Sequence, residues 1–422
     1  MLPIDDIRNN PEEIAQKLAL KGESPAIDAI LKLDEIYRSD LGQANDLRAQ
    51  RNKASEEIAR AKRSGNNADG AIRAMGEVAQ QIKALEEKTL TSKSELDELL
   101  LGLPNLPHES VPFGKDEKEN RLVREWGEIP KQDFEVKAHL KLGEALGLFD
   151  FERGAKISGS GFPLYTGGGA KLERGLINYM LDVHTEQHGY TEIFPPFVVR
   201  SQSAVTTGQL PKFAADMYPS EKDGLWLIPT AEVPVTNIHQ DEILTEDQLP
   251  INYTAYSACF RREAGSYGKD TRGFLRLHQF NKVELVKFVQ PENSYDELEK
   301  LLVHAEVILQ SLGLKYRVIE LCSGDLSFSA AKCYDLELWA PGEQKWLEVS
   351  SCSNYEDFQA RRGNIRYRRE ADKKVEFVHT LNGSGVATPR LMVALLETYQ
   401  NEDGSISIPE PLQSYVGAEV LD

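Results

Sequence analysis

Two long stretches near the N-terminus repeat their hydrophobic residues at the alternating three- and four-residue spacing of a heptad seam. The first stretch carries Ile30, Leu33, Tyr37, Ala44, Leu47, Ala54, Ile58 and Ala61; the second carries Met75, Val78, Ile82, Leu85, Leu96 and Leu99, with Thr89 and Ser92 as weaker seam positions. Between them, the sequence SGNNADG at 64–70 stops a helix and starts a turn. We therefore predict an antiparallel two-helix hairpin that extends for about 50 Å at 1.5 Å per residue.

The helical period ends at residues 101–114, where three prolines interrupt the chain. Beyond this linker, strand-like runs and amphipathic helical segments follow one another irregularly. The predicted helices are 171–188, 294–312 and 389–399, and the predicted strands are 224–228, 315–321, 333–339, 345–350 and 375–381. A further strand at 189–199 contains Pro195 and Pro196, which place it at a sheet edge or in an interface. The absence of a regular βαβ alternation predicts an α+β fold around an antiparallel sheet.

One hairpin, from Cys259 to Glu284, concentrates charge on what should be a sheet surface. Its strands are predicted at 253–263 and 276–288, with a glycine-containing loop at 264–275 between them. Because side chains alternate along a strand, polar and aromatic residues fall on one face: Arg261 and Glu263 on the first strand, and Arg276, His278, Phe280, Lys282 and Glu284 on the second. Alternation alone leaves two interpretations open, a site for a charged, flat ligand or a solvated sheet face.

Composition narrows the class of protein. The chain has 422 residues, 41% hydrophobic and 27% charged, which are values near the globular average. No apolar run is long enough to cross a bilayer, and the acidic N-terminus does not resemble a secretory signal. The four cysteines are widely spaced without a CxxC pair, which indicates free thiols in a reducing cytoplasm.

Charge is distributed unevenly along the chain. The formal net charge is −18, yet residues 44–93 hold ten basic side chains against seven acidic ones. A positive hairpin on an acidic body could contact a phosphate backbone. The alternative is a dimerising coiled coil with a solvated charged face, which heptad statistics alone favour.

Common catalytic motifs do not account for the chain. The sequence HTEQH at His184 to His188 has the spacing of a zinc site, but Thr185 stands where a metalloprotease needs glutamate, so packing histidines are favoured. Neither a GxSxG elbow nor a phosphate loop ending in GK[ST] is present. In TLNGSGVATPR, Gly383 and Gly385 allow close backbone approach before a helix whose first turn carries Arg390, a suitable place for an anionic ligand.

Several polar clusters resemble a known family. FRRE at 260–263 followed by RLHQF at 276–280 resembles motif 2 of the class II aminoacyl-tRNA synthetases, GYTEIFPPFVV at 189–199 resembles motif 1, and the glycine-rich run ending in Arg390 resembles motif 3. TAEVP at 230–234, EVSSCSNYEDFQARR at 348–362 and the helical arm narrow the resemblance to the seryl-tRNA synthetase family.

The resemblance implies an enzyme that activates L-serine with ATP and Mg²⁺ and transfers it to tRNA-Ser, and it leaves tRNA-Sec open as a second substrate. It further implies a homodimer whose interface includes motif 1. The implied domains are a tRNA-binding domain with the arm at 1–103, a linker at 104–118 and a class II catalytic domain at 119–422, built on an antiparallel sheet with flanking helices.

The resemblance also assigns residues by their roles. The catalytic residues are Arg261, Glu348 and Arg390, and the metal ligands are Glu348 and Ser351. The ATP site comprises Arg261, Arg262, Glu263, Arg276, Phe280, Glu348, Val349, Ser350, Ser351 and Arg390. The serine site comprises Thr230, Ala231, Glu232, Arg261, Glu284, Asn382 and Ser384.

These roles agree with physical chemistry and make one geometric demand. A carboxylate is already a nucleophile, so adenylation needs positioning and charge neutralisation instead of a general base. Glu348 and Ser351 stand three residues apart and would face opposite sides of a regular strand, so we predict a bulge or strand end near Val349. Pro389 and Arg262 depart from the wider class pattern without altering an assigned role.

Two other functions would also fit parts of the sequence. One is a relative that activates an amino acid and loads it onto a carrier protein, which could dispense with the arm. The other is a non-catalytic paralogue, against which the intact Arg261, Glu284, Glu348 and Arg390 argue.

Overall fold

The computed structural model describes residues 1–129, 131–263 and 273–422, which group into two compact units. Unit 1 comprises 1–19 and 23–104, and unit 2 comprises 20–22 and 105–422. The tip of the predicted hairpin, 264–272, lies outside the described residues. None of the described helices combines the length and apolar character needed to cross a membrane.

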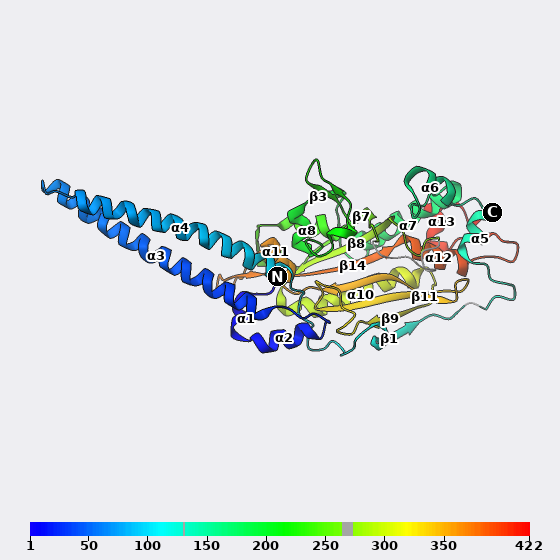
Figure 1. Cartoon of the computed structure of the whole chain (residues 1–422). Coiled ribbons are helices and arrows are strands. Elements are labelled where there is room, and N and C mark those ends of the chain that lie inside the picture. Colours follow the sequence, from blue (N-terminus) through cyan, green and yellow to red (C-terminus); the bar gives the residue numbers. More distant parts are fainter. Residues whose placement is uncertain (130, 264–272) are drawn as a thin grey trace. The chain divides into compact units, whose positions relative to one another are not determined.

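Unit 1 is helical and contains the predicted arm (Figure 1). Its helices are α1 (Ile4–Asn9), α2 (Pro11–Ala19), α3 (Ile27–Arg63) and α4 (Asp69–Leu101). α3 and α4 pack against each other along the seam, where Ala44 and Ile82 are almost fully buried, and an ion pair of 2.6 Å joins Arg48 to Glu86 across the two helices. The last predicted seam position is wrong: Leu99 is exposed, and Leu100 is buried because the final step from Leu96 spans four residues.

Unit 2 is built on an eight-stranded sheet, which confirms the predicted α+β class. The strand order is β1-β9-β10-β11-β14-β8-β7-β2. The bounds are β1 (Arg121–Trp126), β9 (Tyr316–Glu320), β10 (Lys332–Ala340), β11 (Lys345–Asn354), β14 (His379–Ala387), β8 (Gln279–Val289), β7 (Ile251–Phe260) and β2 (Thr191–Glu192). All neighbours are antiparallel except β2, which pairs parallel with β7 at the sheet edge, where the Pro195–Pro196 pattern predicted an edge strand.

In the described part of the chain, helices and three small sheets complete unit 2. The helices are α5 (His139–Ala145), α6 (Phe151–Ser158), α7 (Gly167–Glu186), α8 (Ser201–Thr207), α9 (Glu232–Thr236), α10 (Ser294–Ser311), α11 (Phe358–Gly363), α12 (Thr388–Thr398) and α13 (Glu410–Val416). The small sheets contain β3 (Val198–Arg200), β4 (Pro219–Ser220) and β5 (Leu225–Leu227); β6 (Ile243–Thr245), β12 (Arg366–Arg368) and β13 (Val375–Phe377); and β15 (Ile406–Ser407) with β16 (Val420–Leu421). The predicted strand at 375–381 is thus two strands, β13 and the start of β14.

The two faces of the central strand β8 contact different parts of unit 2. Its odd-numbered residues Val283 and Leu285 belong to the main hydrophobic core, which also contains side chains of α7, α10 and α12. The even-numbered Phe280 and Lys282 line a cavity instead. β7 ends at Phe260 and β8 begins at Gln279, so the predicted strands were too long at the loop end, and Arg261, Glu263, Arg276 and His278 lie beyond the paired region.

The glycines of β14 allow helices to approach closely. A Cβ atom at Gly383 would lie 2.3 Å from Leu301 of α10, and one at Gly385 would lie 2.6 Å from His184 of α7. Both glycines therefore fit the strand against its helices. This corrects the expectation that they make room for a ligand, although the helix that follows does begin at Thr388 and carry Arg390 in its first turn.

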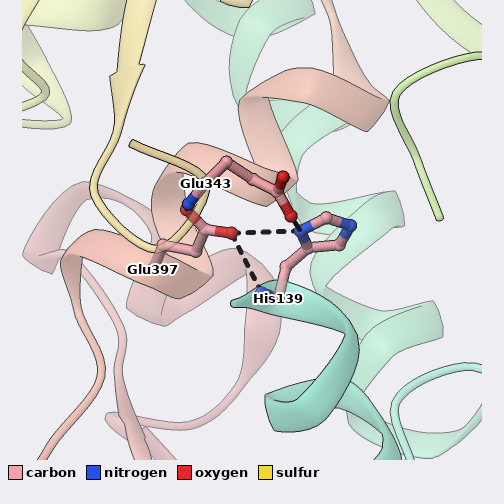
Figure 2. A group of neighbouring side chains, drawn as sticks. All are labelled: His139, Glu343 and Glu397. Atoms are coloured by element: carbon pink, nitrogen blue, oxygen red, sulfur yellow. Dashed lines mark hydrogen bonds and ion pairs between the residues drawn. The ribbon is translucent and has the colours of Figure 1, made fainter. Parts of the chain in front are cut away.

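His139, Glu343 and Glu397 join three segments near the C-terminal end of α12 (Figure 2). Glu397 Oε1 accepts hydrogen bonds from the backbone N–H of His139 at 2.9 Å and from His139 Nδ1 at 3.0 Å, while Oε2 accepts from the N–H groups of Gly342 and Glu343 at 2.8 and 3.1 Å. His and two carboxylates could in principle hold a cation. Both oxygens of Glu397 are already used by donors of the protein, so we interpret this group, the α12 clasp, as structural.

Candidate active site

A cavity of about 860 Å³ opens over β8, β11 and β14 in unit 2. Twelve of the residues predicted from the sequence line it: Thr230, Glu232, Arg261, Glu263, Arg276, Phe280, Glu348, Val349, Ser351, Asn382, Ser384 and Arg390. These residues come from five separate stretches of the chain. The fold therefore gathers the predicted ATP and serine residues around one cavity.

Glu284 forms the centre of the predicted serine half. Its side chain is fully buried, and it pairs across the sheet with Ser384 of β14. The carboxylate accepts hydrogen bonds from Thr230 Oγ1 at 2.7 Å and from Asn382 Nδ2 at 2.9 Å, and Lys282 Nζ lies 2.5 Å from Oε2. This carboxylate is therefore held in place from three sides before any ligand arrives.

Glu232 is the second carboxylate of the serine half. It lies in the first turn of α9, directly after the buried Ala231, and Gln359 Nε2 of α11 donates to its Oε1 at 2.6 Å. Thr380 Oγ1 in turn donates to Gln359 Oε1 at 2.8 Å, which fixes the orientation of the amide. Burial and then the negative charge of Glu284 raise the pKa of Glu232 to about 7. Around neutral pH this carboxyl group can be charged or neutral, and a nearby cation would decide which.

The predicted ATP half contains an aromatic ring beside a cationic side chain. The Arg261 guanidinium lies 5.1 Å from the centroid of the Phe280 ring, and Arg261 Nε donates to the carbonyl of Pro229 at 3.3 Å. Arg276 forms an ion pair of 3.0 Å with Glu263, whose φ of 50° is in the left-handed region that non-glycine residues rarely adopt. Such backbone conformations are frequent at binding sites, where the surrounding structure holds them in place.

Arg390 also lines the cavity. Its Nη1 donates to the carbonyl of Glu348 at 2.8 Å and lies 3.6 Å from Glu348 Oε2, while Nε donates to the carbonyl of Leu275 at 3.3 Å. Its guanidinium thus connects β11 to the end of the motif 2 segment. It also remains partly exposed toward the cavity, where an anionic ligand could reach it.

The predicted bulge near Val349 is confirmed. Leu336 of β10 pairs with Ser350 and Glu337 pairs with Glu348, so Val349 is the extra residue. Glu348 and Ser351 consequently both line the cavity despite their odd spacing. Carboxylate and hydroxyl oxygens are hard donors that suit Mg²⁺, so the residues present fit such an ion.

Four predicted residues do not line the cavity: the fully buried Glu284, described above, and Ala231, Ser350 and Arg262. Ala231 is buried beneath the start of α9, and Ser350 Oγ donates to the carbonyl of Ser384 at 2.6 Å, joining β11 to β14. The Arg262 guanidinium lies 5.8 Å from the centroid of the Tyr218 ring, and its backbone N–H donates to the carbonyl of Asp216. Their side chains support or flank the cavity without lining it.

Several lining or supporting residues were missed from the sequence. Tyr355 donates through its hydroxyl group to Asn382 Oδ1 at 2.6 Å, and Gln359 orients Glu232. No local pattern signals either residue, because each reaches its partner across the fold. Lys282 did carry a signal: it stands between Phe280 and Glu284 on the same strand face.

The HTEQH histidines are packed, as the sequence analysis favoured. His184 Nε2 lies 2.9 Å from the carbonyl oxygen of Gly385, and its Nδ1 lies 3.0 Å from His188 Nδ1. Burial lowers the pKa of His184 to about 4. A neutral ring that bonds the backbone of β14 is a packing element, and this pair is not arranged as an open metal site.

Comparison with protein families gives two matches. The family model of the seryl-tRNA synthetase N-terminal domain matches residues 1–107. The model of the tRNA synthetase class II core domain (G, H, P, S and T) matches residues 214–399.

Individual relatives match the whole chain. A serine–tRNA ligase of Chlorobaculum parvum is 56% identical, with 100% of each chain covered. The crystal structure of seryl-tRNA synthetase from Pyrococcus horikoshii complexed with ATP is 40% identical with a TM-score of 0.92, covering 100% of this chain and 99% of that one. The crystal structure of the cytoplasmic serine–tRNA ligase from Naegleria fowleri in complex with AMP is 29% identical to this chain with a TM-score of 0.87. The match covers 100% of this chain and 99% of that one.

Proposed function

The chain belongs to the seryl-tRNA synthetase family, and from this membership we propose how its cavity activates serine. The protein is a serine–tRNA ligase, an enzyme that uses ATP to join serine to its tRNA. The roles of individual residues, the metal ion, the assembly and the tRNA contacts are proposals, which we argue from the contacts described above.

We propose that Glu284 and Glu232 bind the amino acid. A serine molecule carries an ammonium and a hydroxyl group, and two buried carboxylates whose charges interact can accept hydrogen bonds from both. Thr230, Asn382 and Ser384 complete a polar wall around them. Alanine would leave these buried polar groups without partners, so such a wall rejects alanine far more strongly than apolar packing could. The pair of buried carboxylates is the observation that carries the proposal.

We propose that Phe280 stacks on the adenine ring and that Arg261, Arg276 and Arg390 bind the phosphates. In the structure the Arg261 guanidinium lies on the Phe280 ring, so it would move aside as a base stacks there. Arg261 would then contact the α-phosphate and the serine carboxylate, and Arg390 would contact the γ-phosphate. Val349 and Glu263 also line the cavity, and Ser350 and Arg262 are their neighbours in the chain.

The chemistry requires alignment more than proton transfer. One carboxylate oxygen of serine attacks the α-phosphorus, a new P–O bond forms, and the bond to the β-phosphate breaks to release pyrophosphate. Cationic side chains that hold both reactants in line lower the entropic cost of the step and stabilise the charge that develops. Glu348 and Ser351 would hold Mg²⁺, which supplies charge neutralisation at the phosphates when it is bound.

We propose that unit 1 binds tRNA through its arm, with the division at 1–103, 104–118 and 119–422. Residues 44–93 carry a net positive charge in an acidic chain, and most of their basic side chains are exposed. Basic residues on an exposed helix surface attract a phosphate backbone. We extend the proposal to tRNA-Sec as a second substrate and to the cytoplasm as the place of action, in line with the four free cysteines.

A homodimer is also proposed, with the motif 1 segment in its interface. Phe194 is 76% exposed, and beside it lies a second cavity of about 510 Å³ lined in part by Ile177, Leu181 and Tyr256. An exposed aromatic ring at a hollow lined by both apolar and polar side chains is typical of a surface that a partner covers. Sedimentation at several protein concentrations tests the assembly state directly.

Pyrophosphate exchange tests the proposed function of the cavity. The protein should exchange labelled pyrophosphate into ATP only when L-serine is present, and it should then charge tRNA-Ser. Exchange without charging of any tRNA would favour a carrier-loading enzyme. No exchange with any amino acid would favour a non-catalytic paralogue.

A further inference from the structure

Lys282 stands between the two halves of the cavity on a single strand. Phe280, Lys282 and Glu284 alternate onto one face of β8, and each step of two residues covers about 6.6 Å. Under the proposed function, adenine lies at Phe280 and the serine ammonium lies at Glu284. The atoms that react, the serine carboxylate and the α-phosphorus, must then lie between these two groups, opposite Lys282.

The ammonium group of Lys282 is buried but only partly used. Its side chain is 7% exposed and lines the cavity, and its Nζ lies 2.5 Å from Glu284 Oε2. An ammonium has three N–H donors, and in the described part of the chain Glu284 is the ionic partner of this one. The remaining donors are available to a ligand in the cavity.

Glu284 is covered by Lys282. The carboxylate is fully buried, and Thr230 and Asn382 hold its oxygens from short side chains, whereas Lys282 reaches it through a flexible four-carbon stem. A substrate ammonium can take over the place of another ammonium without changing the charge balance. Its arrival at Glu284 would free Lys282 Nζ to turn toward the neighbouring carboxylate and phosphate.

From this geometry we propose that Lys282 is a catalytic residue of serine activation. When serine binds, the Lys282 ammonium group leaves Glu284 and contacts the reacting serine carboxylate and the α-phosphate of ATP. The inference rests on the proposed function of the cavity. In the step itself, the serine oxygen forms a bond to the α-phosphorus as the bond to the pyrophosphate leaving group breaks. Lys282 keeps its proton throughout and supplies a second positive charge beside Arg261, where negative charge accumulates.

The competing explanation is that Lys282 is only the structural counter-ion of Glu284. β8 contains a matched control for that role. Lys287 is buried as well, with 1% of its side chain exposed against 7% for Lys282, and forms an ion pair of 2.7 Å with Glu297 of α10. Its odd position places it on the other face of β8, and it does not line the cavity. Replacing either lysine removes one buried ion pair from the same strand, but only Lys282 faces the proposed reactants.

The experiment compares three variants of the full-length protein: Lys282→Met, Lys282→Gln and Lys287→Met. Thermal melting measures their stability, and serine-dependent pyrophosphate exchange at saturating serine and ATP measures their kcat. Both Lys282 variants should lose about 10²-fold in kcat, as expected for loss of a group that stabilises transition-state charge, with KM for ATP little changed. Lys287→Met should melt at a lower temperature with kcat within about two-fold of the unmodified protein.

Lys282→Gln is decisive if the methionine variant does not fold, because a glutamine amide can still donate to Glu284 while carrying no charge. A kcat for folded Lys282→Gln within about three-fold of the unmodified protein, with at most a changed KM for serine, would overturn the proposal and leave Lys282 a structural counter-ion. Absence of serine-dependent exchange in the unmodified protein would instead refute the proposed function, before any variant is compared.

Discussion

The state of Glu232 should make serine binding depend on pH. Its pKa is raised to about 7, first by burial and then by the charge of Glu284. A serine ammonium bound between the two carboxylates favours the ionised form of Glu232 and lowers its pKa. Binding of serine is therefore coupled to release of a proton, and affinity is lost as the pH falls through 7.

The size of the effect follows from the fraction of Glu232 that is ionised. With a pKa of about 7, the group is about 90% ionised at pH 8 and about 10% ionised at pH 6. If only the ionised form binds serine, the apparent dissociation constant varies inversely with this fraction. KM for serine should then rise about ten-fold from pH 8 to pH 6. The serine amino group itself stays protonated throughout this range.

The assay is pyrophosphate exchange at varied serine concentration, measured at every half pH unit from pH 6 to pH 8.5. KM for ATP, measured at the same pH values, is the control for titration of the ATP phosphates. Glu232→Gln is the matched variant, since it keeps the shape and cannot ionise. We expect weaker serine binding that no longer varies with pH. Glu173, whose pKa burial also raises to about 7, remains present in this variant and so cannot explain a loss of the dependence. A serine KM that is constant across the range in the unmodified protein would refute the reasoning.

Three further predictions concern other parts of the molecule. Glu348→Gln should raise the Mg²⁺ concentration needed for half-maximal exchange by about ten-fold or more, because a charged oxygen ligand is lost; an unchanged magnesium titration would remove Glu348 from the metal site. Reversing the exposed charges of Lys62 and Arg63 to glutamate should raise KM for tRNA in the charging assay without altering exchange, and equal charging would argue against the arm as the tRNA contact. Glu397→Ala should lower the free energy of unfolding by about 3 kcal/mol or more in urea titrations, because four donors of the α12 clasp lose their acceptor, whereas the exposed Glu402→Ala should change it little.

The spacing of hydrophobic and polar residues was sufficient to predict the helices and strands in which that spacing repeats regularly. The heptad seam predicted α3 and α4, because a long antiparallel pair must bury one narrow stripe throughout. The seam prediction was wrong only at Leu99. The buried residue after Leu96 is Leu100, four positions later, instead of Leu99. Alternation likewise placed Phe280, Lys282 and Glu284 on one face of β8, but it could not choose between a ligand site and a wet surface.

The rest of the site depends on contacts between distant parts of the chain. Gln359 reaches Glu232 from a helix 127 residues away, and no local pattern encodes that meeting. The glycines of β14 suggested a ligand, yet their partners are Leu301 and His184, which only the packing of the helices reveals. The bulge at Val349 could be predicted because the assigned chemistry required two side chains on one face at a spacing that a regular strand forbids.

The extra residue at Val349 has a consequence for how this enzyme can vary over evolutionary time. Substitutions along β11 change one side chain each, whereas loss of a single residue at the bulge would restore strict alternation and invert everything on one side of it. Either Glu348 or Ser351 would then face the helices. The length of this segment is therefore under stronger constraint than the identity of most of its residues, and insertions or deletions there should be rarer than amino-acid replacements.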